Sequence, residues 1–156
     1  MKGVEVALYE PEIPQNTGNI GRLCVGFDVP LSLVGPLGFE INEKRVRRAG
    51  LDYWVNLRYR LFPNPEDFLN EKRDFEIVGF SKTAETAYFD YEFKDKTILL
   101  FGPETRGLPP EFLKAHHIPV LKIPMLGPIR SHNLANSVAM ALAEIYRKKF
   151  HHPAKS

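Results

Sequence analysis

The chain has 156 residues, of which 44% are hydrophobic and 26% are charged, so its composition is that of a globular protein and excludes a disordered or fibrous one. Lysine and arginine number 21 against 19 acidic residues, and a net charge of +2 does not by itself mark a nucleic-acid-binding protein. Cys24 is the only cysteine, which excludes a disulfide framework and a cysteine-based zinc site within one chain.

The chain also lacks the usual sequence signals of membrane insertion and export. No apolar run approaches the ~18 residues of a membrane span, and the N-terminal MKGVEVALYE lacks a signal peptide's apolar stretch. The length fits one domain rather than two. We therefore expect a single cytoplasmic domain over residues 1–156 that has no membrane partner.

Apolar periodicity predicts strands and helices that alternate along the chain. In chain order we expect strands over Val4–Leu8, Leu31–Val34, Val55–Leu61, Glu76–Phe80, Thr97–Phe101 and Val120–Ile123. The predicted helices cover Ile20–Phe27, Asn42–Ala49, Pro65 to about Lys72, Pro109–Ala115 and Leu134–Phe150. This alternation indicates an α/β fold with a mainly parallel sheet and helices on both faces.

Several residues are typical of helix ends. The segment Asn16–Asn19 offers capping side chains ahead of the first predicted helix, and Asn64 precedes a proline at the start of the third. Gly50 is placed as the residue that follows the second helix. The tail from about His151 is expected to be mobile.

Three polar loops follow predicted strands, at Glu10–Arg22, Gly102–Pro110 and Pro124–Ser137. In parallel α/β sheets, ligands usually bind beyond the carboxyl ends of the strands. These loops are therefore where we expect the functional site.

The loop Gly102–Gly107 has the glycine spacing of a phosphate-binding loop. Leu108 and Pro109, however, stand where that motif requires Lys and Ser or Thr, so a nucleotide-binding α/β enzyme is only a fallback interpretation. The alternative is an ordinary strand-to-helix turn with an ion pair between Glu104 and Arg106.

In each of the other two loops, the candidate residues have two possible interpretations. Four polar residues cluster at the start of the last helix, namely Ser131, Asn133, Asn136 and Ser137. They either cap this helix or form hydrogen bonds with a polar ligand. Arg22 either holds a phosphate or is a solvated surface arginine, and Cys24 is more typical of a small buried hydrophobe than of a reactive thiol.

A basic segment, KRVRR, runs from Lys44 to Arg48 and is followed by Arg58 and Arg60. Such a segment either contacts nucleic acid or is a solvated face. Tyr53, Trp54 and Tyr59 lie among these cations and either stack on exposed bases or belong to the core. Two adjacent histidine pairs, at 116–117 and 151–152, are interpreted as solvated.

Three motifs in a fixed order carry a family resemblance. The chain contains NTGNIGR, FGPETRGLP and IPM followed by SHNLANSVA, and it resembles the SpoU-type 2′-O-methyltransferases of the SPOUT superfamily. Within that branch it is most similar to the tRNA (cytidine/uridine-34)-2′-O-methyltransferases, and the likeness extends through PLGFEINEKRVRRAGLDYW. The resemblance implies a SPOUT domain with a C-terminal trefoil knot, a homodimer, and the tRNA anticodon stem-loop as the partner.

The resemblance also implies roles for individual residues. S-adenosylmethionine, which leaves as S-adenosylhomocysteine, would be held by Phe80, Gly102, Gly107, Ile123, Leu126 and Ser131. The catalytic site would contain Arg22, Asn16, Glu104, Ser131 and Asn133. The tRNA would contact Lys44, Arg45, Arg47 and Arg48, and no metal is required.

The implied reaction is methylation of the ribose 2′-hydroxyl of the wobble nucleotide. Arg22 would either activate this hydroxyl or hold the adjacent phosphate, and a guanidinium is hard to deprotonate. The alternatives are an RNA-binding module without turnover and methylation of a different tRNA or rRNA nucleotide. His132 and Ala135 depart from the motif, where relatives often have Met and Ser, and this bears on the choice of nucleotide more than on catalysis.

Overall fold

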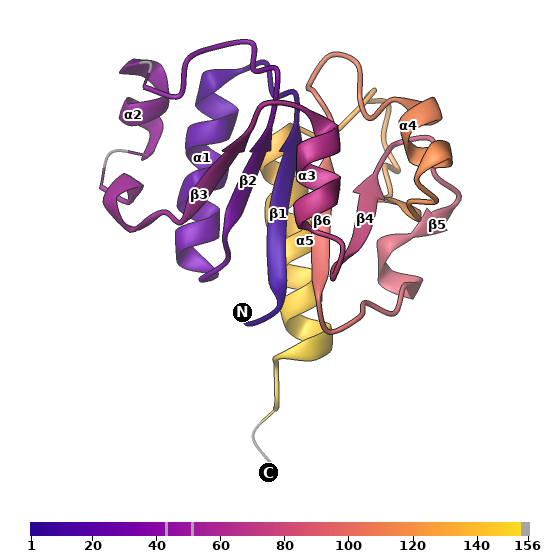
Figure 1. Cartoon of the computed structure of the whole chain (residues 1–156). Coiled ribbons are helices and arrows are strands. Elements are labelled where there is room, and N and C mark those ends of the chain that lie inside the picture. The colour runs from indigo at the N-terminus through magenta and orange to yellow at the C-terminus, as the bar shows by residue number, and fades with distance from the viewer. Residues whose placement is uncertain (43, 51, 154–156) are drawn as a thin grey trace.

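A computed structural model describes residues 1–42, 44–50 and 52–153, with the backbone alone at residues 47, 49 and 50. In these ranges, seven strands form one sheet in the order β3-β2-β1-β6-β4-β7-β5. All of its strand pairs are parallel (Figure 1). The strands are β1 (Val4–Tyr9), β2 (Leu31–Val34), β3 (Tyr59–Phe62), β4 (Glu76–Phe80), β5 (Thr86–Ala87), β6 (Thr97–Phe101) and β7 (Val120–Lys122).

Helices cover both faces of the sheet. The longest two, α1 (Pro14–Gly26) and α5 (Leu134–Lys149), lie on one face, while α3 (Pro65–Glu71) and α4 (Pro110–Ala115) lie on the other (Figure 1). The basic helix α2 (Lys44–Gly50) packs against α1. Two short 3₁₀ helices, η1 (Trp54–Asn56) and η2 (Tyr88–Asp90), complete the fold. Among the helices of the described ranges, none is long and apolar enough to cross a membrane.

The central strands are buried on both faces, as their continuous apolar runs predict. Val6 and Leu8 of β1 join the core under α1 and α5, where they belong with Ile20 and Val138. The residue between them, Ala7, joins the second core, which also contains Phe68 of α3. Alternation along each strand therefore divides the apolar residues between two cores.

Most predicted elements are confirmed, but the start of β3, the end of α2 and the start of α1 were predicted wrongly. The strand predicted over Val55–Leu61 starts with the η1 turn, because buried Leu57 turns towards α1, and β3 begins only at Tyr59. Gly50 is the last residue of α2 rather than the residue after it. The two-residue strand β5 and both 3₁₀ helices were not anticipated, since such short elements have no periodicity.

The first helix starts at Pro14, six residues earlier than predicted, so the prediction of a cap at Asn16–Asn19 is also wrong. Asn16 and Thr17 are buried inside the helix. Pro14 is well suited to the first helical turn because its missing N–H would have no intrahelical partner there. The trefoil knot stays a prediction, and of the expected mobile tail, residues 154–156 lie outside the described residues.

One ion pair is buried beside the central strands. The Glu5 carboxylate of β1 accepts hydrogen bonds from the Ser32 hydroxyl and, at 2.9 Å, from the Lys72 ammonium just after α3. Glu5 is 3% exposed, and the lysine side chain is 17% exposed. Because a buried carboxylate needs a partner, this pair ties the end of α3 to β1.

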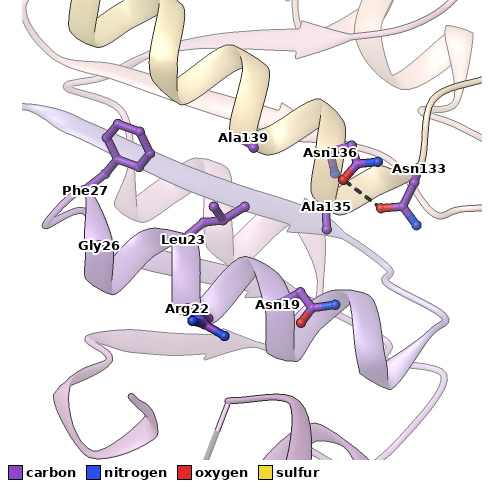
Figure 2. A pocket seen from close by; sticks show the side chains of 9 residues that line it. All are labelled: Asn19, Arg22, Leu23, Gly26, Phe27, Asn133, Ala135, Asn136 and Ala139. Atoms are coloured by element: carbon purple, nitrogen blue, oxygen red, sulfur yellow. Dashed lines mark hydrogen bonds between the residues drawn. The ribbon is translucent and has the colours of Figure 1, made fainter. Parts of the chain in front are cut away.

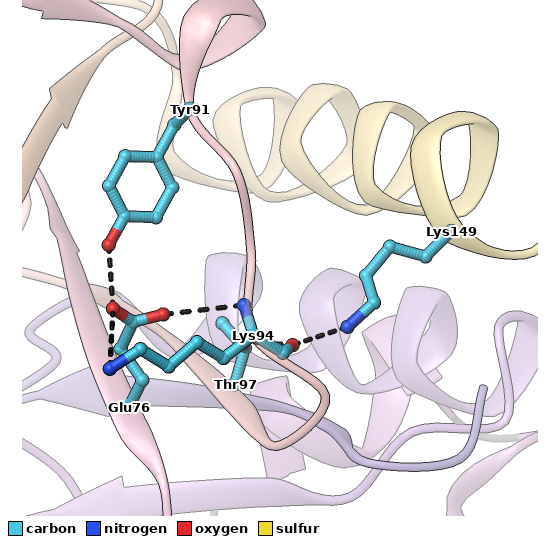
Figure 3. A network of polar contacts seen from close by, with 5 residues as sticks. All are labelled: Glu76, Tyr91, Lys94, Thr97 and Lys149. Carbon is cyan, nitrogen blue, oxygen red and sulfur yellow. Dashed lines mark hydrogen bonds and ion pairs between the residues drawn. The ribbon is translucent and has the colours of Figure 1, made fainter.

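A second polar network holds the loop at the amino end of β6 (Figure 3). The Glu76 carboxylate accepts a 2.7 Å hydrogen bond from the Tyr91 hydroxyl and pairs with the Lys94 ammonium at 3.7 Å. The Lys94 carbonyl accepts hydrogen bonds from Thr97 and from Lys149 at the end of α5. Burial and the contact with Glu76 raise the pKa of Tyr91, so its hydroxyl remains a donor.

The buried ion pair makes a stability prediction. Replacing Lys72→Met removes the charge that compensates the Glu5 carboxylate, so we expect the free energy of unfolding to fall by about 3–5 kcal/mol. Urea denaturation followed by circular dichroism measures this change. As a control, Lys96→Met removes a lysine from an exposed pair with Asp74 and should cost under about 1 kcal/mol. Equal losses in the two variants would contradict the special role of the buried pair.

Candidate active site

The loops after β1 and β6 are joined by hydrogen bonds at the carboxyl edge of the sheet. The Glu104 carboxylate accepts from the backbone N–H groups of Glu12, at 2.8 Å, and Ile13, at 3.1 Å. These two residues lie immediately before α1, so a side chain about 90 positions away supports the start of the helix. The predicted ion pair between Glu104 and Arg106 is wrong, because Arg106 instead pairs with Glu10 at 3.5 Å.

A reciprocal contact strengthens this junction. The Glu12 carboxylate accepts hydrogen bonds from Thr105, at 3.0 Å from its backbone N–H and at 2.8 Å from its hydroxyl. The backbone bond and then the hydroxyl bond lower the pKa of Glu12. Neither residue was predicted to make this contact, because no local pattern relates positions that are 93 residues apart.

Asn16 connects the third loop to the same network. Its amide is 8% exposed, donates to Glu104 at 3.5 Å and accepts from the Asn133 amide at 3.2 Å. The Asn133 oxygen in turn caps α5 by accepting from the Asn136 N–H at 3.2 Å. Asn133 is therefore both a helix cap and a link to Asn16. Capping is confirmed for this residue, and hydrogen bonding to a polar ligand stays a prediction.

The turn from Gly102 to Gly107 favours glycine at both ends, for different reasons: Gly102 lacks space for a side chain, and Gly107 has a positive φ. A Cβ atom at Gly102 would lie 2.3 Å from the Leu108 nitrogen, and Gly107 has a φ of 70°. Gly102 follows β6 directly and Phe80 is the last residue of β4, where its ring stacks on Phe101 at 4.7 Å between centroids. The structure thus brings these predicted cofactor positions to one edge of the sheet.

The loop after β7 has free groups for binding a ligand. In the segment from Met125 to Ser131, only the Ile129 backbone N–H has a hydrogen-bond acceptor among the described residues. The other backbone N–H groups of this segment have none there. Leu126 is fully exposed, and Ile129 is 54% exposed. An adenosine group, with a flat ring and several donors and acceptors, fits apolar side chains beside unpaired backbone N–H groups. Ile123, at the start of this loop, is half-buried, and Ser131, at its end, is exposed.

Arg22 is one of the residues that line a cavity of about 460 Å³ between α1 and α5. Figure 2 shows Asn19 and Arg22 on α1, with Asn136 in the first turn of the facing helix α5 and Asn133 just before it. Arg22 is exposed and has no ion-pair partner among the described residues. Its guanidinium carbon instead lies 4.7 Å from the centre of the Tyr53 ring. Arg22 and Ser131 therefore stay outside the hydrogen-bonded network of Asn16, Glu104 and Asn133.

The predicted RNA-contacting residues lie on α2, on the outer side of α1. Lys44, Arg45 and Arg48 are exposed, while Val46 is buried. The side chain of Arg47 lies outside the described residues. The exposed cations thus form a basic face that is anchored by one buried valine.

The cysteine and the paired histidines have the environments that the sequence predicts. Cys24 is buried, which raises the pKa of its thiol and keeps it protonated. Both histidine pairs are exposed, and the described residues contain no cluster of side chains that could hold a metal ion. The His132 ring contacts the Pro124 carbonyl oxygen at 3.2 Å.

Comparisons with known proteins agree on one family of enzymes. The model of the SpoU rRNA Methylase family matches residues 3–143. A tRNA (cytidine(34)-2′-O)-methyltransferase from Aeromonas hydrophila is 44% identical over 148 residues, which is 93% of this chain and 94% of that protein. One of the same name from Saccharophagus degradans is 40% identical over 144 residues, 92% of this chain and 94% of that one.

Two solved structures share the fold. A structure described as giving insights into the 2′-OH methylation of C/U34 on tRNA has a TM-score of 0.88 and 44% identity, and the match covers 93% of this chain and 95% of that chain. An AdoMet-bound rRNA methyltransferase from Sinorhizobium meliloti has a TM-score of 0.85 and 25% identity. That match covers 97% of this chain and 59% of the other.

The hydrogen bonds of Glu104 can be tested by removing its carboxylate. Replacing Glu104→Ala leaves the N–H groups of Glu12 and Ile13 without their acceptor, so we expect a loss of about 1–3 kcal/mol in the free energy of unfolding. Urea denaturation measures it. The control Glu85→Ala changes an exposed glutamate outside the network and should shift stability by no more than about 0.5 kcal/mol. An unchanged stability in Glu104→Ala would disprove the structural role of this carboxylate.

Proposed function

The chain belongs to the SpoU methylase family, and we propose that it methylates the ribose 2′-hydroxyl of the wobble nucleotide, cytidine or modified uridine 34, in tRNA. The main support is the convergence of three loops in the Asn16–Glu104–Asn133 network beside the Arg22 cavity. The 44% identity to a relative named for this reaction supports the choice of nucleotide.

S-adenosylmethionine is the methyl donor, and six residues at or after the carboxyl ends of β4, β6 and β7 are proposed to hold it. They are Phe80, Gly102, Gly107, Ile123, Leu126 and Ser131. When bound, it supplies an electrophilic methyl group and leaves as S-adenosylhomocysteine. The exposed Leu126 would cover its apolar ring, and the unpaired backbone N–H groups near it would read its polar edge. The chemistry proposed for these residues needs no metal.

Arg22 is proposed to bind the phosphate next to the reacting ribose. A guanidinium keeps its proton in proteins, which favours a phosphate clamp over a general base. It is exposed and lines the α1–α5 cavity, so its donors are accessible to a ligand. Ser131 and Asn133 would then contact the nucleotide, while Asn16 and Glu104 hold Asn133 and the loop ends in place.

The protein is proposed to act as a homodimer on the anticodon stem-loop. In this proposal, residues of one subunit complete the site of the other. Lys44, Arg45, Arg47 and Arg48 on α2 would contact the tRNA backbone. We propose that residues 1–156 form one SPOUT domain that acts in the cytoplasm, where tRNA is available.

Arg22 provides the direct test of the reaction. In an assay with labelled S-adenosylmethionine and unmodified tRNA, we expect the wild type to transfer label. Arg22→Ala should lower kcat/KM at least about 100-fold, because it removes a preorganised donor from the reacting site. Calorimetry should show unchanged affinity for S-adenosylmethionine.

The matched control is Arg73→Ala, an exposed arginine that donates a hydrogen bond to Asn70 on the opposite face of the sheet. It should retain wild-type activity. Full activity in Arg22→Ala would refute the assigned role. A wild type that binds tRNA but neither the methyl donor nor label would instead indicate an RNA-binding module.

The basic face of α2 makes a separate prediction. The double reversal Lys44→Glu and Arg45→Glu should weaken tRNA binding at every salt concentration and reduce the log–log salt slope by about 2, because two phosphate contacts are lost. Fluorescence anisotropy measures both quantities. The double reversal Arg73→Glu and Lys114→Glu changes the net charge equally and should have a smaller effect. If both pairs weaken binding equally, α2 is not the contact surface.

A further inference from the structure

We propose that Tyr53 is a positioning residue for Arg22: its ring holds the guanidinium in place without neutralising it, so that the charge stays available for the substrate phosphate. This inference rests on the proposed function. Its physical basis is the contact of 4.7 Å between the guanidinium carbon and the ring centre, which is well inside the ~6 Å range of cation–π interactions.

The other arginines with a described partner have a polar or charged one. Arg60 also lies over an aromatic ring, that of Phe62 at 4.9 Å, but it pairs with Glu71 as well. Arg58 and Arg147 donate to Asp28 and Glu144 at 2.8 Å. A carboxylate in that position competes with phosphate for the same donors and cancels the charge. An aromatic face interacts with the flat side of a guanidinium and leaves the N–H groups at its edge free. Arg22 is therefore held by the one kind of partner that leaves both its charge and its donors for a ligand.

The backbone of Tyr53 is fixed by the 3₁₀ turn that follows it. The Tyr53 carbonyl accepts from the Asn56 N–H at 2.9 Å, and the Trp54 carbonyl accepts from the Leu57 N–H at 3.1 Å. The Trp54 ring also lies 5.3 Å from the ring of Tyr59. The turn is thus held by hydrogen bonds and by ring packing.

Gly21, the residue before Arg22, lets this turn approach α1. A Cβ atom at Gly21 would lie 3.0 Å from Leu57, which is itself buried against the helix. The close approach brings the aromatic ring within reach of the arginine that follows. Tyr53 itself is half-buried and is not part of either apolar core, so its removal should leave the fold intact.

Substitution of the ring separates this role from a structural one. Tyr53→Leu should lower kcat/KM for tRNA methylation by about 3- to 30-fold, the range of a cation–π contact. Tyr53→Phe keeps the aromatic face and should restore activity to near the wild-type value. Affinity for S-adenosylmethionine and thermal stability should be unchanged in both variants.

Two further variants make the test selective. In an Arg22→Ala background, Tyr53→Leu should have no additional effect, because the ring acts through the arginine. Phe75→Leu removes a similar ring that lies 5.5 Å from Lys72 on the other face of the sheet, and it should leave activity unchanged.

The outcomes distinguish this inference from the proposed function. A wild type that transfers no methyl group to tRNA refutes the function itself. An active wild type with a fully active Tyr53→Leu variant refutes only the positioning role. An additive loss in the double variant, or a loss that Tyr53→Phe does not repair, also overturns it.

Discussion

The carboxylate of Glu104 is the interaction on which the arrangement of the site depends. It binds the two backbone N–H groups before α1 and contacts Asn16 within that helix, which in turn accepts a hydrogen bond from Asn133 before α5. Loops that are distant in the sequence therefore share one network. Without it, the parallel sheet would still bring these loops to one edge, but their relative positions would not be set.

The charged side chains of this fold differ in the kind of partner that they have. The Glu5–Lys72 pair is buried, and the lysine compensates the charge of the carboxylate. At the carboxyl edge, the carboxylates of Glu104 and Glu12 accept hydrogen bonds from groups within the protein. Arg22, which lies further along α1, is instead supported by a neutral ring. The accessible positive charge of Arg22 beside polar amides suits a phosphate-bearing substrate that must be oriented before methyl transfer.

Local signals in the sequence predicted the frame of this molecule better than its site. The apolar runs Ile77–Phe80 and Ile98–Phe101 predicted β4 and β6, whose ends are as expected, because strands buried on both faces are mostly apolar. The start of α1 was missed because Glu104, not a neighbouring side chain, supports it. The resemblance identified the polar motif residues, but the partners of Arg22 and Arg106 depend on tertiary contacts that no short segment encodes.

The most direct test of the proposed function is the position of the methyl group. Purified protein, S-adenosylmethionine and unmodified tRNA would be incubated, and the product digested and mapped by nucleoside mass spectrometry. We expect 2′-O-methylcytidine or a 2′-O-methyluridine derivative at position 34 of the tRNA. A methyl group on another ribose would contradict the assigned nucleotide, and a methyl group on a base would contradict the assigned reaction.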